Sequence, residues 1–191
     1  MKDTKSYLSK IVQDMPDSGI KDFFDVANTM EGALSLGVGE PDFPTPEHVR
    51  EAAIASIKKG DTKYTDNRGT VELRAAAADY LTKFDLHYDK QDEILITMGA
   101  SEGIDLALRT LVNPGEEVLV AEPSYVSYIP CIELCGGVPV SLKLRAENKF
   151  RLTREQLEEK ITEKSKVLLI SYPNIPTGAI MEKEDLEAIE E

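Results

Sequence analysis

The sequence predicts an α/β fold in which helices cover a mainly parallel sheet. From about residue 93 onward, short apolar segments of strand type alternate with helical segments, and the connections between them are short. Because parallel strands must be joined by crossover connections, this alternation is typical of a three-layer domain. The predicted strands cover residues 93–97, 118–121, 138–144 and 167–171.

The helices are predicted from capping residues and from apolar residues at helical spacing. Thr45 can cap a helix whose first residue is Pro46, and Thr70 can cap the next one. Ser124 is a third candidate cap, and residues 153–156 have the pattern of a capping box. The predicted helices cover residues 20–30, 46–59, 70–81, 102–111, 125–134, 154–161 and 183–191.

Composition excludes several classes of protein. Hydrophobic residues make up 41% and charged residues 30% of the chain, which is typical of a globular protein and argues against disorder. A net charge of −13 opposes binding to nucleic acid or to an anionic membrane surface. We find no run of 18 apolar residues and no secretory signal, so we expect a cytoplasmic protein without a membrane span.

The cysteines and the best-known catalytic motifs give little support for other chemistry. Cys131 and Cys135 are too few for a disulfide framework or a zinc site, so we expect two small buried apolar side chains. The segment around Gly39 lacks the third glycine of a dinucleotide fingerprint. There is no Gly-Lys-Ser/Thr phosphate loop and no Gly-x-Ser-x-Gly elbow, so we do not expect acyl-transfer chemistry.

Candidate site residues follow the predicted strands. Ligands of parallel sheets bind at the carboxyl ends of strands. Ala100 and Ser101 follow the first strand and begin a helix, whose free N–H groups favour a phosphate, although a plain helix cap is the alternative. Tyr125 follows the second strand and could stack on a flat ring, or could instead cover the core.

Six segments in one order give a more specific pattern. They are residues 35–43 (SLGVGEPDF), 63–74 (KYTDNRGTVELR), 97–103 (TMGASEG), 113–118 (NPGEEV), 122–128 (EPSYVSY) and 173–178 (PNIPTG). Together they resemble the class I and II aminotransferases, which have fold type I and use pyridoxal 5'-phosphate. The resemblance covers nearly the whole chain but only the N-terminal part of such an enzyme.

The resemblance implies a role for each matching residue. Gly39 would let the backbone approach the substrate carboxylate, and Tyr64 would reach the cofactor phosphate of the neighbouring subunit of a homodimer. Ala100 and Ser101 would hold the phosphate of their own subunit, and Tyr125 would stack on the pyridine ring. The N-terminal arm would pack on the partner subunit.

One position departs from the family pattern. The family has asparagine immediately before Pro-Thr-Gly, where this chain has Ile175. That asparagine donates a hydrogen bond to the ring hydroxyl oxygen of the cofactor, and isoleucine cannot donate. Asn174 is adjacent, but a shift of one residue points its side chain elsewhere, so we do not expect it to substitute.

The resemblance also implies a domain division and a reaction. We expect residues 1–45 to form the N-terminal arm and a small-domain segment, and residues 46–191 to form the N-terminal part of the large cofactor-binding domain. The reaction would move an amino group from an amino acid to a 2-oxo acid in amino acid metabolism or biosynthesis. The family motifs that hold the Schiff-base lysine and the substrate-binding arginine are expected beyond residue 191.

Two alternatives to this function stay open, and a third is not supported. The chain ends inside a predicted helix, and it could be a catalytically inactive fragment, so we expect that residues 1–191 alone do not transaminate. A lyase or decarboxylase could use the same fold and cofactor. A transcription regulator carrying this domain would need a basic winged-helix segment in front, and none is present.

Overall fold

The computed structural model describes residues 4–16, 25–26, 29–32, 39 and 41–190. The chain divides into two compact units, one made of Met1–Met15 with Thr97–Glu191 and the other of Pro16–Ile96. Each unit is described by itself below. The helix predicted over residues 20–30 lies largely outside the described residues, and the domain boundary at residue 45 stays a prediction.

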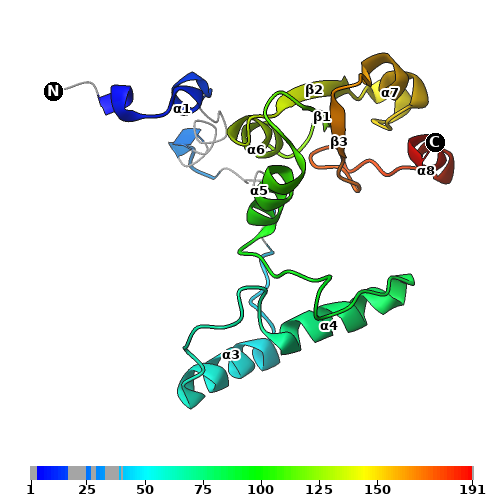
Figure 1. The fold of residues 1–191 in the computed structure, drawn as a ribbon. Coiled ribbons are helices and arrows are strands. Elements are labelled where there is room, and N and C mark those ends of the chain that lie inside the picture. Colours follow the sequence, from blue (N-terminus) through cyan, green and yellow to red (C-terminus); the bar gives the residue numbers. More distant parts are fainter. Residues whose placement is uncertain (1–3, 17–24, 27–28, 33–38, 40, 191) are drawn as a thin grey trace. The chain divides into compact units, whose positions relative to one another are not determined.

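A parallel sheet forms the centre of the first unit (Figure 1). Its strands are β1 (Glu117–Glu122), β2 (Val138–Lys143) and β3 (Ser165–Leu169). The order is β2-β1-β3, and β1 pairs in parallel with both neighbours. The predicted α/β fold with a parallel sheet is therefore confirmed for this part of the chain.

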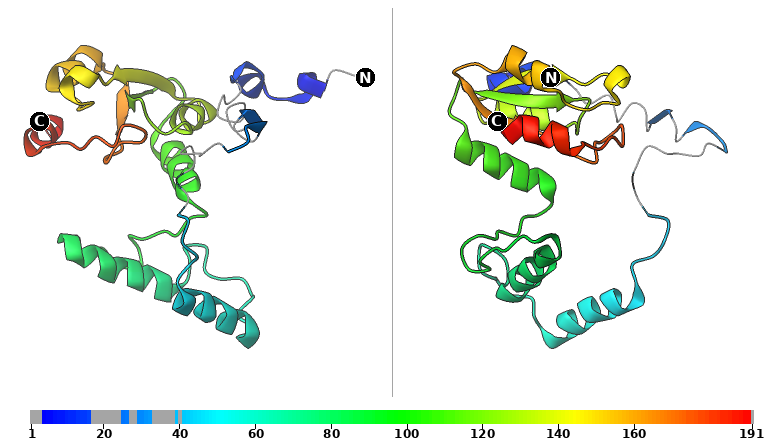
Figure 2. Two further views of the ribbon diagram at one scale, coloured as in Figure 1. Left: turned by 180° about the vertical axis from the view of Figure 1, so that it is seen from behind. Right: turned by 90° about the vertical axis from the view of Figure 1, so that its right-hand side faces the viewer.

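Helices cover both faces of this sheet (Figures 1 and 2). They are α5 (Ala100–Leu111) and α6 (Tyr128–Leu134) on one face, and α7 (Arg154–Lys160) and α8 (Lys183–Glu190) on the other. Side chains of β1 alternate between the two cores, because Val118 and Val120 face α5 and α6 while Leu119 and Ala121 face α7. The strand is buried on both sides, as the central strand of a three-layer fold requires.

Local capping chemistry sets several helix ends of the first unit. The Thr153 hydroxyl accepts from the Gln156 backbone N–H, and the Gln156 amide oxygen accepts from the Thr153 N–H, so the predicted capping box is present. The prediction for α6 was wrong at its start, because Ser124 does not cap it. Residues 125–128 instead form a turn in which the Tyr128 N–H donates to the Tyr125 carbonyl, and the helix begins at Tyr128.

Three short helical segments complete the first unit among the described residues. They are η1 (Thr4–Tyr7), α1 (Lys10–Asp14) and η3 (Ala146–Asn148). The free thiols of Cys131 and Cys135 are partly buried and pack against the apolar cluster around Ile132. No helix in the described part of the chain is both long and apolar enough to cross a bilayer.

The second unit is mainly helical. It contains α3 (Glu47–Lys59), α4 (Val71–Leu81) and η2 (Thr82–Phe84). The Thr70 hydroxyl caps α4 by accepting from the Leu73 N–H, as predicted, and Gly60 ends α3 in the left-handed conformation. Pro46, and not Thr45, occupies the N-cap of α3.

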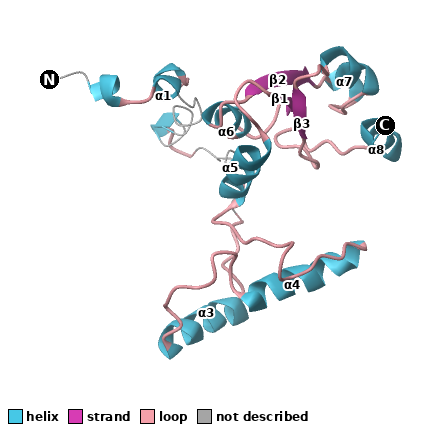
Figure 3. Cartoon of the chain, in the orientation of Figure 1, coloured by secondary structure: helices cyan, strands magenta, loops and turns pink. Residues whose placement is uncertain are grey.

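The strand predicted at residues 93–97 is absent from the described residues. Figure 3 draws this segment as loop, whereas the strands lie within residues 117–169. A strand needs a ladder partner, and the backbone bonds of this segment are local ones at Glu93 and Thr97 and one longer-range bond from the Ile96 N–H to the Arg68 carbonyl, which do not form a ladder. Ile96 also packs closely on Gly69, and this contact leaves no room for a side chain at residue 69. The φ of +92° at this residue also favours glycine.

Candidate functional site

The first turn of α5 offers hydrogen-bond donors at its N-terminus. Gly99 occupies the N-cap with a φ of 87° and has no side chain to satisfy the first N–H groups. The backbone N–H groups of Ala100 and Ser101 lie in this turn, at the positive end of a 12-residue helix. The Ser101 hydroxyl adds a further donor. This turn has the chemistry of a phosphate site.

Glu102 in the same turn was missed by sequence reasoning. Its carboxylate accepts a hydrogen bond from the Met98 backbone N–H, so the side chain folds back over the residues that precede the helix. A negative side chain in the first turn also stabilises the helix dipole. The glutamate therefore fixes the turn that presents Ala100 and Ser101.

Tyr125 lies beside this turn. Its hydroxyl is 3.2 Å from the Ser101 Oγ, although the two residues belong to different connections. Hydrogen bonds from Ser101 and then from Ser127 hold the pKa of the Tyr125 hydroxyl below its usual value. The ring stands edge-on to the ring of Tyr128, with centroids 5.7 Å apart.

The two tyrosines after β1 have different surroundings. Tyr128 is 8% exposed and belongs to the core between α5, α6 and the sheet, whereas Tyr125 is 36% exposed. A ring that is held at its edge and hydroxyl, yet is partly open to solvent, can cover a flat ligand. This arrangement favours the stacking interpretation of Tyr125 over a role in the core.

Asn174 organises the turn that follows β3. Its amide nitrogen donates to the Pro123 carbonyl at 3.1 Å, and its amide oxygen accepts from the N–H and the hydroxyl of Thr177. Its backbone N–H donates to Ala179, and its carbonyl accepts from Gly178. The side chain is only 3% exposed, and both ends of its amide are used.

The bond from Asn174 to Pro123 brings two connections together at the carboxyl edge of the sheet. One is the loop after β1 that carries Tyr125, and the other is the turn after β3 that carries Ile175. Ile175 is 59% exposed, so it is not part of the apolar core. Three of the predicted segments, residues 97–103, 122–128 and 173–178, thus meet at one edge of the sheet. The residue before Pro-Thr-Gly is exposed to solvent there.

Gly39 and Tyr64 belong to the second unit, so their positions relative to this edge are not defined. A Cβ added to Gly39 would meet no atom within 4 Å, so the fold of this chain leaves room for a side chain there. Tyr64 is fully exposed. Packing among the described residues explains neither the glycine at position 39 nor the exposed ring of Tyr64, so their roles remain predictions.

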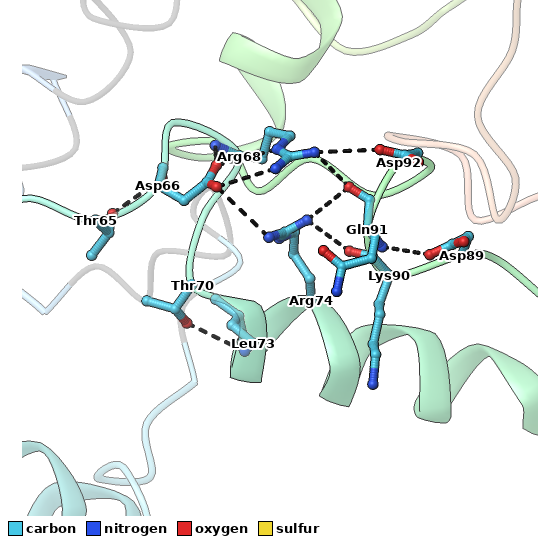
Figure 4. A network of polar contacts seen from close by, with 10 residues as sticks. All are labelled: Thr65, Asp66, Arg68, Thr70, Leu73, Arg74, Asp89, Lys90, Gln91 and Asp92. Carbon is cyan, nitrogen blue, oxygen red and sulfur yellow. Dashed lines mark hydrogen bonds and ion pairs between the residues drawn. The ribbon is translucent and has the colours of Figure 1, made fainter.

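A polar network joins residues 65–68 of the loop that carries Tyr64 to α4 and to residues 89–92 (Figure 4). Arg74 of α4 is completely buried, and its Nη1 donates to the carbonyls of Lys90 and Gln91 at 2.7 and 2.9 Å. Arg68 donates to the same Gln91 carbonyl at 2.7 Å. Asp66 accepts from the backbone and the guanidinium of Arg68, and lies 3.9 Å from Nη2 of Arg74.

Two arginines therefore share one carboxylate. The hydrogen bonds of Arg68, together with the charges of Arg68 and Arg74, lower the pKa of Asp66 to about 2. The Nε of Arg74 is buried without a hydrogen-bond partner among the described residues, which costs about 1–3 kcal/mol. Sequence reasoning missed this network, because the carbonyls that bind Arg74 lie 16 and 17 residues away in the chain.

Pyridoxal phosphate fits only part of this site. The first turn of α5 and Ser101 suit its phosphate, and Tyr125 suits one face of its ring. The turn after β3 does not supply a donor to the ring hydroxyl oxygen, because Ile175 has none and the amide of Asn174 is already engaged. These residues therefore suit binding of the cofactor, but they do not supply the hydrogen bond that would stabilise negative charge on its ring oxygen.

Comparison with known proteins identifies a family. The family model "Aminotransferase class I and II" matches residues 31–191. The chain is 48% identical to a putative aminotransferase, YugH, of Bacillus subtilis, over 97% of this chain and 48% of that protein. It is 43% identical to aromatic-amino-acid aminotransferase 2 of Thermococcus litoralis, over 95% of this chain and 47% of that protein.

Solved structures agree with this result. An aspartate aminotransferase from Thermotoga maritima superposes with a TM-score of 0.90 at 35% identity, covering 95% of this chain and 50% of that one. An aromatic aminotransferase from Pyrococcus horikoshii has a TM-score of 0.80 at 39% identity, covering 89% and 45%. The chain spans about half the length of the curated relatives it matches.

Proposed function

The chain belongs to the class I and II aminotransferase family, and from this premise we propose that it forms the cofactor-holding part of a pyridoxal 5'-phosphate-dependent aminotransferase. The enzyme would move an amino group from an amino acid to a 2-oxo acid. The observation that carries the proposal is the pairing of Ser101 with Tyr125 at the carboxyl edge of the sheet. There, a phosphate donor and an aromatic ring lie side by side.

Residues of this chain would bind and orient the cofactor. The N–H groups of Ala100 and Ser101 and the Ser101 hydroxyl would hold the phosphate, where the dipole of α5 favours a negative charge. The Tyr125 ring would cover one face of the pyridine ring and exclude water from it. When bound, the cofactor supplies the electron sink for chemistry at the substrate α-carbon.

Residues of the second unit, Pro16–Ile96, would contact the substrate and the partner subunit. Gly39 would allow the backbone to approach the substrate carboxylate, since no side chain stands there. The exposed hydroxyl of Tyr64 would donate to the cofactor phosphate of a partner subunit, which makes the proposed enzyme a homodimer. We also propose a cytoplasmic role in amino acid metabolism, and family membership is its support.

Ile175 sets a limit on this function. A hydrogen bond to a charged acceptor contributes about 1.5–3 kcal/mol, and the turn after β3 cannot provide one at this position. We assign no lysine of residues 1–191 as the covalent anchor. For the isolated chain we therefore expect cofactor binding without transamination.

The test compares the isolated chain with the full reading frame that contains it. Each protein is titrated with pyridoxal 5'-phosphate and then assayed with a panel of amino acids and 2-oxo acids. Turnover that requires both substrates in the longer protein would support a transaminase. Release of ammonia or pyruvate without a 2-oxo acid would indicate a lyase, and turnover by residues 1–191 alone would contradict the expected inactivity.

A further inference from the structure

We propose that Asp66, Arg68 and Arg74 are positioning residues for Tyr64, and we call these three residues the Asp66 network. The inference rests on the proposed function, in which the Tyr64 hydroxyl reaches a partner's cofactor phosphate. Tyr64 is fully exposed, so no packing of its ring within this unit holds it. Its place therefore depends on the backbone of its loop.

The loop that carries Tyr64 runs from residue 61 to residue 69, between α3 and α4. Asp66 follows Tyr64 by two residues. Its carbonyl accepts from the Gly69 N–H at 2.9 Å, and its carboxylate accepts from the Arg68 N–H at 2.8 Å. Asp66 therefore closes the C-terminal half of the loop into a tight turn, which begins two residues after Tyr64.

Arg74 connects this turn to a rigid element. It projects from α4, is completely buried, and binds the carbonyls of Lys90 and Gln91 while one amino group faces Asp66. Arg68 reaches the Gln91 carbonyl from the loop itself. Figure 4 shows both guanidinium groups converging on that carbonyl and on Asp66. The loop, the helix and the 90–91 backbone are thus held together by charged groups.

The burial of Arg74 indicates how it acts. A side chain with no exposed surface cannot touch a cofactor or a substrate, so any effect on catalysis must pass through the loop. Among the described residues the buried Nε has no hydrogen-bond partner, which destabilises the fold, so burial of this cation gives little support for a role in stability alone. A role in positioning gives this charged network a function in the loop that carries the exposed Tyr64.

The test is a double-mutant cycle on cofactor affinity, made in the full reading frame that contains this chain. The dissociation constant of pyridoxal 5'-phosphate is measured by absorbance for wild type, Asp66→Asn, Tyr64→Phe and the double variant. Tyr64→Phe should weaken binding about tenfold, as loss of one hydrogen bond to a charged group predicts. Asp66→Asn should weaken binding by a similar factor, but should add less than about twofold to Tyr64→Phe.

Two further variants separate positioning from folding. Arg68→Met leaves the buried Arg74 paired with Asp66 and should give the same pattern if Asp66→Asn fails to fold. Glu158→Gln removes an exposed ion pair to an arginine on α7 and should leave cofactor affinity unchanged. Thermal unfolding of every variant shows how far each one affects stability.

The outcomes distinguish failure of the Asp66 network from failure of the proposed aminotransferase function. If Asp66→Asn weakens binding as much in the Tyr64→Phe background as in wild type, the Asp66 network does not act through Tyr64 and the inference fails. An unchanged affinity in Asp66→Asn and Arg68→Met also overturns it. If Tyr64→Phe binds the cofactor normally, or the wild type does not bind it, the proposed function itself is contradicted.

Discussion

Two adjacent residues in the turn after β3 should respond to substitution in opposite ways. Asn174→Ala removes three side-chain hydrogen bonds, one to the Pro123 carbonyl and two from Thr177, in a site that is 3% exposed. At about 1 kcal/mol for each bond, and more where a buried partner is left unsatisfied, unfolding should become easier by about 2–4 kcal/mol. Ile175→Asn replaces a side chain that is 59% exposed, so stability should change by less than about 0.5 kcal/mol.

Urea unfolding of residues 1–191, followed by circular dichroism, measures both effects. The matched pair lies in one turn, so changes in the unfolded state are similar for the two variants. The second readout is cofactor affinity, which Ile175→Asn should increase about tenfold because it restores a donor to the ring oxygen. If Asn174→Ala leaves stability unchanged but weakens cofactor binding, Asn174 is free to serve the ligand and our interpretation of its hydrogen bonds is wrong.

Three further predictions concern single contacts. Ser101→Ala should raise the pKa of Tyr125 toward its usual value, because it removes the main hydrogen bond that lowers it, and an ultraviolet titration would detect the change. The pKa of Asp66 is lowered to about 2, so its stabilising ion pairs should be complete above about pH 4 and lost as the pH falls to about 2, which NMR titration of the carboxyl carbon would show. Gly69→Ala should accelerate amide hydrogen exchange in α4 more than Gly60→Ala does. Both glycines have a positive φ, but only a Cβ added at residue 69 would lie 2.6 Å from a carbon atom. Equal exchange rates in the two variants would contradict this clash.

The elements that sequence reasoning predicted correctly depend on local signals. The capping box at Thr153 and the cap at Thr70 each need only residues within one turn, and both are present. The strands after residue 117 are short apolar runs between turn residues, and their parallel pairing follows from the helices that separate them. Such patterns can be recognised without knowing the rest of the fold.

The elements that were predicted wrongly depend on distant partners. Residues 93–97 have the composition of a buried strand, but a strand forms only beside another strand, and the described residues supply none for it. The burial of Arg74 was not predicted at all: an arginine on a helix usually faces solvent, yet this one is buried and donates to two carbonyls 16 and 17 residues away. Periodicity within one helix contains no information about these acceptors.

If the proposed function holds, cofactor affinity and the rate of the full-length enzyme should respond to different residues of this chain. The donors that suit the phosphate belong to the first turn of α5, and their positions do not depend on the turn after β3. Under the proposed function, a donor to the ring oxygen from the turn after β3 would have to come from the residue before Pro-Thr-Gly, since the amide of Asn174 is committed to Pro123 and Thr177. A full-length aminotransferase that contains this chain with Ile175 should therefore bind the cofactor through its phosphate and still react slowly. Reversion to asparagine should raise the rate by a larger factor than the affinity, because ring charge develops mainly during the reaction.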